Sequence, residues 1–398
     1  MSISGAPSAI NVSENATATF HSNLYGWAGG TLNQTGGTVD IKGGLRINED
    51  TGSLGTATVN LSGGTFVADS DADGDWTFVG VYAGQSFLNV SGTADETFGS
   101  NLIVGYEAPG TLNQTGGTVN IKGGLRISEI TGSSTVNLSG GTFVADSDAD
   151  GDWTFVGVFG GQGFLNVSGT ADVTFGYNLI VGYDAPGILT QTGGTVTVGG
   201  DLELALAGST GTYDLGGGTL DMTGDDINFG AGTAAFNFTG GTLLNVNTFD
   251  SSLTQTNTDA QSYLAPGASV GTMNINGDYD LLSGIYQVEI DGLGSNDLVN
   301  VTGVATLDGV VQVEFLGGFV PELGETYDVL TAGSQIFLGT EFAVDNSLLP
   351  GGGFLHSLVN GDTTLRLEYV PEPSTFALAA LGLVGLAFAG RRRRKKTE

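Results

Sequence analysis

Two copies of one acidic segment contain the residues of this chain best suited to chemistry. Each copy reads Asp-Ser-Asp-Ala-Asp-Gly-Asp-Trp, and the carboxylates are Asp69, Asp71, Asp73, Asp75, Asp146, Asp148, Asp150 and Asp152. Alternate carboxylates followed by glycine form the first half of a calcium-binding loop, because they can converge on one hard cation. The twelfth position is Gly80 or Gly157, where such a loop has Glu. We therefore expect either a weak Ca²⁺ site, with Ca²⁺ as the one candidate cofactor, or a solvated acidic turn.

Catalytic arrangements have little support in the sequence. The candidate bases for a polysaccharide lyase occur twice at one repeat position, as Lys42 and Arg46 and then as Lys122 and Arg126. Hydrolysis of a glycosidic bond needs one pair of carboxylates about 5–10 Å apart, whereas the acidic segments are duplicated. The two histidines, His21 and His356, are isolated in the sequence. We expect a protein that is not an enzyme, and a polysaccharide-active enzyme is the competing class.

Composition and charge exclude several other classes. The 398 residues include 11 Lys and Arg against 42 Asp and Glu, a formal net charge of −31. A surface this acidic repels phosphate backbones, which excludes nucleic-acid binding. With 69 Gly, 8 Pro and no Cys, the chain is neither collagen-like nor a disulfide scaffold. Abundant Gly, Val, Thr and Asn instead favour many short strands joined by tight turns.

The chain repeats itself on two scales. Gly30–Gly110 recurs almost unchanged as Gly110–Gly187, and a diverged third copy begins at Ile188 and fades by Val246. Within these copies a shorter unit ends in Ser/Thr-Gly-Thr or Ser/Thr-Gly-Gly-Thr about every 25 residues, a period typical of stacked repeats. Its closing threonines are Thr38, Thr65, Thr93, Thr118, Thr142, Thr170, Thr195, Thr219 and Thr242. A unit this short cannot fold alone and must stack on its neighbours.

Aligned columns indicate how the units stack. One column reads Asn33, Asn60, Asn89, Asn113, Asn137, Asn166, Thr190, Asp214 and Asn237. Another, just after each threonine, reads Val39, Phe66, Ala94, Val119, Phe143, Ala171, Val196, Leu220 and Leu243. Apolar columns at the ~4.8 Å strand spacing make a continuous core, stacked Asn amides bond to one another, and Gly pairs allow positive-φ corners. We predict an all-β, right-handed parallel β-solenoid of about nine coils of ~25 residues; antiparallel hairpins or propeller blades are the alternative.

The predicted domain boundaries follow changes in composition and in the repeat pattern. We assign 1–246 to the solenoid, 247–261 to a polar linker and 262–369 to a β-rich C-terminal module. That module resembles the β segment after the repeats of autotransporter-like surface proteins, and it either extends the solenoid or caps it. The aromatic pairs after the acidic segments are Trp76 with Phe78 and Trp153 with Phe155. We expect them to fill the solenoid core rather than to form a carbohydrate-stacking shelf.

The C-terminal segment 370–398 has three parts in a fixed order. Pro371-Glu372-Pro373 precedes the uncharged stretch 374–390, and the basic run Arg391, Arg392, Arg393, Arg394, Lys395 and Lys396 follows. A helix of that length spans ~25 Å, which is short but sufficient for a transmembrane helix. The basic run places the C-terminus in the cytoplasm and the body of the protein on the far side.

This order of parts resembles the PEP-CTERM sorting signal, a tail also catalogued as an ice-binding protein C-terminal domain. The resemblance implies export, recognition by an exosortase-type membrane enzyme, cleavage near Pro371–Pro373, and release to the cell surface or extracellular matrix. Met1–Phe20 lacks the basic and apolar parts of a signal peptide, so we expect a start codon further upstream or a fragment; a copy that is not exported is the alternative. The Thr-x-Thr pairs fall out of register, so ice binding is not predicted.

Together these features predict an exported, non-catalytic surface or matrix protein that acts in adhesion or in association with exopolysaccharide. The polysaccharide would then be a partner of the shaft, and the membrane a partner of 374–390 before processing. The alternatives are a polysaccharide-active enzyme of β-helix fold and a permanently membrane-anchored surface protein.

Overall fold

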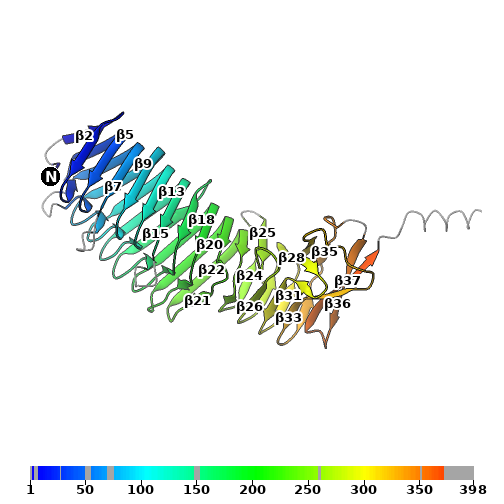
Figure 1. Ribbon diagram of the computed structural model, residues 1–398. Helices are drawn as coiled ribbons and strands as arrows, with labels where there is room; N and C mark the ends of the chain where they lie inside the picture. The colour runs from blue at the N-terminus through cyan, green and yellow to red at the C-terminus, as the bar shows by residue number, and fades with distance from the viewer. Residues whose placement is uncertain are drawn as a thin grey trace, which may run out of the picture.

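The chain folds into one long parallel β-solenoid (Figure 1). The computed structural model describes residues 2–3, 8–26, 28–49, 55–69, 76–147, 153–258, 261–349 and 352–371, and in these residues every helix or strand assigned is a strand. The solenoid has about 12 turns, so the predicted count of nine was too low. The count was low because the strand ladder continues where the sequence repeat has already faded.

Short strands form one side of the solenoid, here called the short-strand sheet. In spatial order they are β1 (Ser2–Ile3), β4 (Leu24–Gly26), β6 (Leu45–Ile47), β8 (Thr77–Val79), β10 (Leu102–Val104), β12 (Leu125–Ile127), β14 (Thr154–Val156), β17 (Leu179–Val181), β19 (Leu202–Leu204), β21 (Ile227–Phe229), β23 (Thr248–Phe249), β26 (Thr272–Ile275), β30 (Leu298–Val301), β33 (Thr326–Ala332), β37 (Thr364–Pro371) and β36 (Gly352–Val359).

The remaining strands form the long-strand sheet, which bends once in most turns. They are β2 (Ser8–Val12), β3 (Thr17–Phe20), β5 (Gly30–Ile41), β7 (Thr56–Ala68), β9 (Gln85–Phe98), β11 (Gly110–Ile121), β13 (Ser133–Ala145), β15 (Gln162–Val167), β16 (Asp172–Phe175), β18 (Gly187–Val198), β20 (Thr210–Asp221), β22 (Thr233–Leu244), β24 (Leu253–Gln255), β25 (Ser262–Ala265), β27 (Tyr279–Leu281), β28 (Ile285–Gly292), β29 (Ser295–Asn296), β31 (Ala305–Leu307), β32 (Val310–Phe315), β34 (Ile336–Leu338) and β35 (Ala343–Asp345).

Glycine makes the bend in the long-strand sheet possible. Gly37 has a φ of 70° and Gly64 a φ of 87°, a region that side chains with a Cβ rarely adopt. A Cβ on Gly64 would also collide with the carbonyl oxygen of Gly37 in the coil above. Glycine is therefore required at this bend for two reasons: the backbone has a positive φ, and the adjacent coil leaves no room for a Cβ.

The predicted asparagine ladder is present on the outer face of the long-strand sheet. In each coil the Asn Nδ2 donates to the Oδ1 of the Asn one coil earlier. The first bond of the ladder is Asn33 to Asn11 and the last is Asn166 to Asn137, each at 2.8 Å. The ladder changes character after Asn166, where Thr190 and Asp214 occupy the column. It resumes with Asn237, whose Nδ2 donates to Asp214 at 2.6 Å.

Buried glutamines brace the corners from inside the coil. Gln34 Nε2 donates at 2.9 Å to the Thr65 carbonyl in the next coil, and Gln114 and Gln191 make the corresponding bonds. The Gln191 Oε1 also accepts a 2.6 Å hydrogen bond from the hydroxyl of Tyr213. The Oε1 atoms of Gln34 and Gln114 have no hydrogen-bond partner among the described residues. The third copy therefore satisfies a buried amide that the first two leave half satisfied.

The predicted column of closing threonines was wrong in two of its nine coils, those of Thr93 and Thr170, whereas Thr242 pairs with Thr219 as predicted. Thr65 pairs with Asp95, not with Thr93, and Glu96 rather than Ala94 lies beside Phe66. The reason is one extra residue at this corner: Val90 to Asp95 is five residues along β9, whereas the paired stretch Leu61 to Thr65 is four residues along β7. The same shift places Val173, rather than Ala171, in the equivalent position of the second copy.

The solenoid continues through the predicted linker and into the β-rich C-terminal module, which was expected either to extend the solenoid or to cap it. Residues 247–258 contain β23 and β24, which pair in parallel with β26 and β27. The linker prediction was wrong because apolar Phe249 and Leu253 turn inward from this otherwise polar stretch. The last strands change direction, since β37 lies antiparallel to both β33 and β36, and β36 is the final strand of the short-strand sheet.

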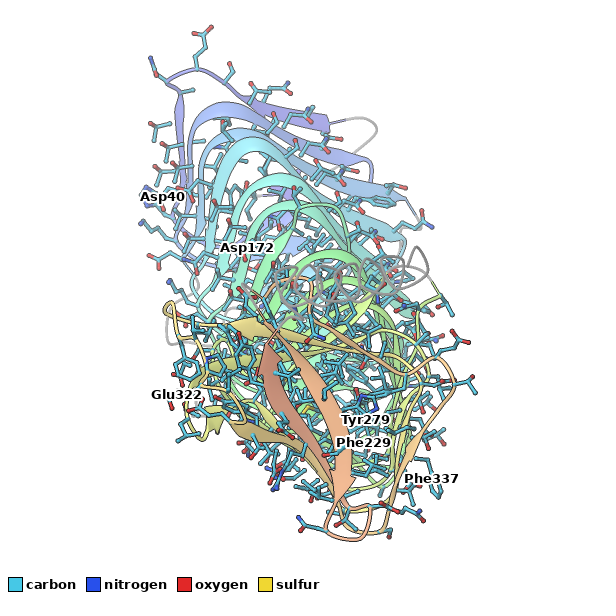
Figure 2. The ribbon with its side chains drawn as sticks, turned by 90° about the vertical axis from the view of Figure 1, so that its right-hand side faces the viewer. Asp40, Asp172, Phe229, Tyr279, Glu322 and Phe337 are labelled. Atoms are coloured by element: carbon cyan, nitrogen blue, oxygen red, sulfur yellow. The ribbon has the colours of Figure 1, made fainter. Side chains whose placement is uncertain are left out.

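Figure 2 views the molecule with its C-terminal end toward the reader. Asp40 lies at the outer edge of the ribbon, whereas Tyr279 and Phe229 lie among the core side chains. Tyr279 is fully buried, and its hydroxyl donates to the Oε1 of Gln255 at 2.8 Å. One hydrophobic core thus extends along the coils with few polar groups, most of which are hydrogen-bonded.

Candidate functional site

Only the first carboxylate of each acidic segment lies in the described part of the chain. Asp69 Oδ2 is 3.8 Å from Lys42 Nζ, and Asp146 Oδ2 is 3.8 Å from Lys122 Nζ. Both aspartates are more than half exposed, so these ion pairs contribute little to stability. Asp71, Asp73, Asp75, Asp148, Asp150 and Asp152 lie outside the described residues. Within the described ranges no group of three or more His, Cys, Asp or Glu could hold a metal ion. Ca²⁺ binding therefore stays a prediction.

The Arg residues proposed as candidate bases are engaged in structural contacts. Arg46 Nη1 lies 3.1 Å from Glu49, and Arg126 Nη1 lies 3.2 Å from Glu129. The Arg126 guanidinium is also 5.0 Å from the centre of the Trp76 ring, within the range of cation–π contact. Burial raises the pKa of Glu129, and Arg126 partly opposes this shift. Both arginines thus hold the outer layer of the short-strand sheet together.

The aromatic pairs lie outside the main core, contrary to prediction. Phe78 packs with Val81, Ile103 and the half-buried Trp76 and Tyr106 in a separate cluster. A second, equivalent cluster is built by Phe155, Val158, Ile180, Trp153 and Tyr183. The reason is alternation, because Thr77 and Val79 at the ends of a three-residue strand face inward and the middle residue must then face outward. These rings cover the outer face of the short-strand sheet around β8, β10, β14 and β17.

The histidines cannot form a catalytic pair. His21 follows β3 in the first coils, whereas His356 lies in β36 at the last edge of the sheet. Both side chains are exposed, and His356 meets the ring of Phe342 edge-on at 5.0 Å. They lie at opposite ends of the solenoid, so each has a local role at most.

One group of carboxylates occurs only once, and sequence reasoning missed it. Glu289 and Glu314 lie in register on adjacent strands, close to the buried Asp297. Asp297 accepts hydrogen bonds from the backbone N–H groups of Gly271 at 2.7 Å and Glu289 at 2.8 Å, and burial raises its pKa to about 7. The cavity beside them holds about 20 Å³, enough for one water molecule but far below a sugar-binding pocket.

A second missed residue is Glu96, a buried acid in the core. It is 0% exposed, and burial together with the neighbouring Asp95 raises its pKa to about 8. The sequence does contain a signal for it. Ala94, Glu96 and Phe98 alternate along one strand, and the same place in the second copy is Val173. An acid that takes the place of a core valine is expected to be buried.

The sorting tail joins the solenoid directly. Pro371 is the last residue of β37 and pairs with Gly352, while Glu372, Pro373, the stretch 374–390 and Arg391–Arg394 lie outside the described residues. Among the described residues no helix is long and apolar enough to cross a bilayer.

Comparison with known families identifies the tail. A family model described as the PEP-CTERM protein-sorting motif matches residues 370–394. No curated protein matches the chain. The motif implies an exported protein whose precursor is anchored in the membrane and processed there by an exosortase. The match begins inside β37, so sorting signal and solenoid share the end of one strand.

Proposed function

We propose that the mature chain is a non-catalytic shaft at the cell surface or in the extracellular matrix, where it acts in adhesion or in association with exopolysaccharide. The observation behind this proposal is the position of the sorting motif, which starts at residue 370 within the last strand. Cleavage near Pro371–Pro373 would leave the solenoid whole and remove only its membrane-directed tail. The solenoid is then the cargo that the sorting system delivers.

The outer surface suits a partner rich in hydroxyl groups. The long-strand sheet presents Asn113 and Thr111 on its outer face. Asn113 lies in register with an Asn on each neighbouring coil, and Thr111 lies in register with Thr135 on one side and Phe87 on the other. Hydroxyls and amides at a regular ~4.8 Å spacing offer many weak hydrogen bonds along the shaft, as adhesion to a long polymer requires.

Two features favour a non-catalytic role over an enzyme. The arginines and the acidic segments occur in duplicate, whereas a catalytic site is single. The unduplicated carboxylates Glu289, Asp297 and Glu314 adjoin a cavity too small for a sugar ring.

The test is made in the native host. Cells and medium are fractionated, and both ends of the mature chain are mapped by mass spectrometry. We expect a chain that ends near Pro371–Pro373 at the surface or in the medium. An intact Arg391–Glu398 tail in the membrane fraction would instead make this a permanently anchored protein. Cleavage of acidic or neutral polysaccharides by the purified chain would overturn the non-catalytic assignment.

A further inference from the structure

One acidic side chain distinguishes the core of the first copy from that of the second. Glu96 in β9 points into the solenoid, and its register partners are Phe66 on β7 and Val119 on β11. The side chain is 0% exposed, and neither carboxyl oxygen has a hydrogen-bond partner in the described part of the chain. A charged carboxylate in such a place loses its hydration, and no hydrogen bond or ion pair replaces it.

Among the residues that the structure describes, no neighbouring group compensates for a charge on Glu96. The closest strands, β7, β8 and β11, contain no titratable side chain. The adjacent Asp95 on β9 is itself an acid and repels a second negative charge. The group is therefore accommodated only while it is protonated and neutral.

The second copy provides a natural control for this position. Val173 in β16 lies between Phe143 on β13 and Val196 on β18. A phenylalanine on one side and a valine on the other thus flank both positions, and both are 0% exposed. The two coils differ at this point of the core by a glutamate side chain in the first copy where the second has a valine.

We infer that the coil containing Glu96 is a proton-dependent weak point of the shaft, closed while Glu96 holds its proton and opening locally when it ionises. The coil containing Val173 has no such response. Because the protein is exported, this coil meets the pH of the medium rather than that of the cytoplasm. An alkaline medium thus loosens the first copy and leaves the second intact.

The sign of the pH dependence follows from the two pKa values. The folded coil raises the pKa of Glu96 from 4.5 to about 8, so the folded state binds the proton more tightly than the open state. The stabilising contribution is complete below pH 4.5 and is lost as the pH rises through 8. Between these values the population of the open coil grows by about tenfold per pH unit.

Hydrogen exchange read by mass spectrometry tests the inference on the full chain in mild detergent. Protection of peptides covering 85–98 and 162–175 is measured from pH 5 to pH 9, corrected for the intrinsic exchange rate. We expect protection of 85–98 to fall by about tenfold per pH unit up to pH 8, while protection of 162–175 stays constant. Equal losses in both peptides, or none in either, would overturn the inference.

Two variants separate ionisation from simple polarity. Glu96→Val copies the second repeat and should make the protection of 85–98 independent of pH. Glu96→Gln keeps a polar group of the same shape but cannot ionise, so it should also abolish the pH dependence at lower overall protection. A pH dependence that persists in either variant would exclude Glu96 as its source. The readout is a property of the fold and does not depend on where the protein is sorted.

Discussion

Residues 30–110 and 110–187 are two copies of nearly the same sequence, and the structure gives them nearly the same coils. Both contain an Arg–Glu pair, an aromatic cluster on the short-strand sheet and a run of the asparagine ladder. Their cores differ where Glu96 stands in one and Val173 in the other. Neighbouring coils support each other only through their contacts, so this difference has a local effect. A solenoid can therefore combine a rigid copy and a pH-sensitive copy within one shaft.

The largest effect is expected from the variant that gives the second copy the buried acid of the first. Val173→Glu should destabilise the coil around β16 by about 3–5 kcal/mol at pH 9, because it buries a charge without a partner. At pH 5 the new carboxyl is neutral and the loss should be about 1–3 kcal/mol. Denaturant unfolding with hydrogen exchange at both pH values measures it. Equal losses at pH 5 and pH 9 would contradict the explanation by ionisation.

A smaller effect should follow when the third copy is made to resemble the first two. Tyr213→Phe removes the hydroxyl that donates to Gln191 Oε1, leaving that oxygen unpaired as in Gln34 and Gln114. We expect a loss of about 1–2 kcal/mol, since one buried acceptor is left unsatisfied. Unfolding in denaturant checks this. A loss of unfolding free energy below the error of the measurement would show that Gln191 stabilises the corner through its Nε2 hydrogen bond alone.

The smallest effect concerns the asparagine ladder that the two copies share. Asn113→Ala removes two hydrogen bonds: the one that Asn113 donates to Asn89 and the one that it accepts from Asn137. Both lie on a half-buried face that is open to water. We expect a loss of about 1 kcal/mol, because water replaces part of each bond. Asn166→Ala is the matched control, since Asn166 makes a side-chain bond to an asparagine on one side only and should lose about half as much. Equal losses would imply that the amides do not act as a ladder.

Much of this architecture could be predicted from the residues themselves. The spacing of the Asn column, the inward Leu and Val columns and the Gly-Gly corners predicted a parallel solenoid with stacked amides, which is confirmed from Asn11 to Asn166. These features repeat in the sequence, so each coil provides independent evidence for the next. The sorting tail was equally readable, because its three parts occur in a fixed order.

The sequence by itself determined the unit of the fold, since a period near 25 residues with alternating apolar positions has few other ways to bury its core. Only the tertiary structure decided the register of the coils that contain an extra residue at the corner. One extra residue after Val90 moves Asp95 opposite Thr65 and brings Glu96 beside Phe66 in the core. The outward position of Phe78 and the inward turn of Phe249 were settled in the same way. The physical reason is that a motif fixes where a coil turns, whereas pairing with the coils on either side fixes which side chains share a column.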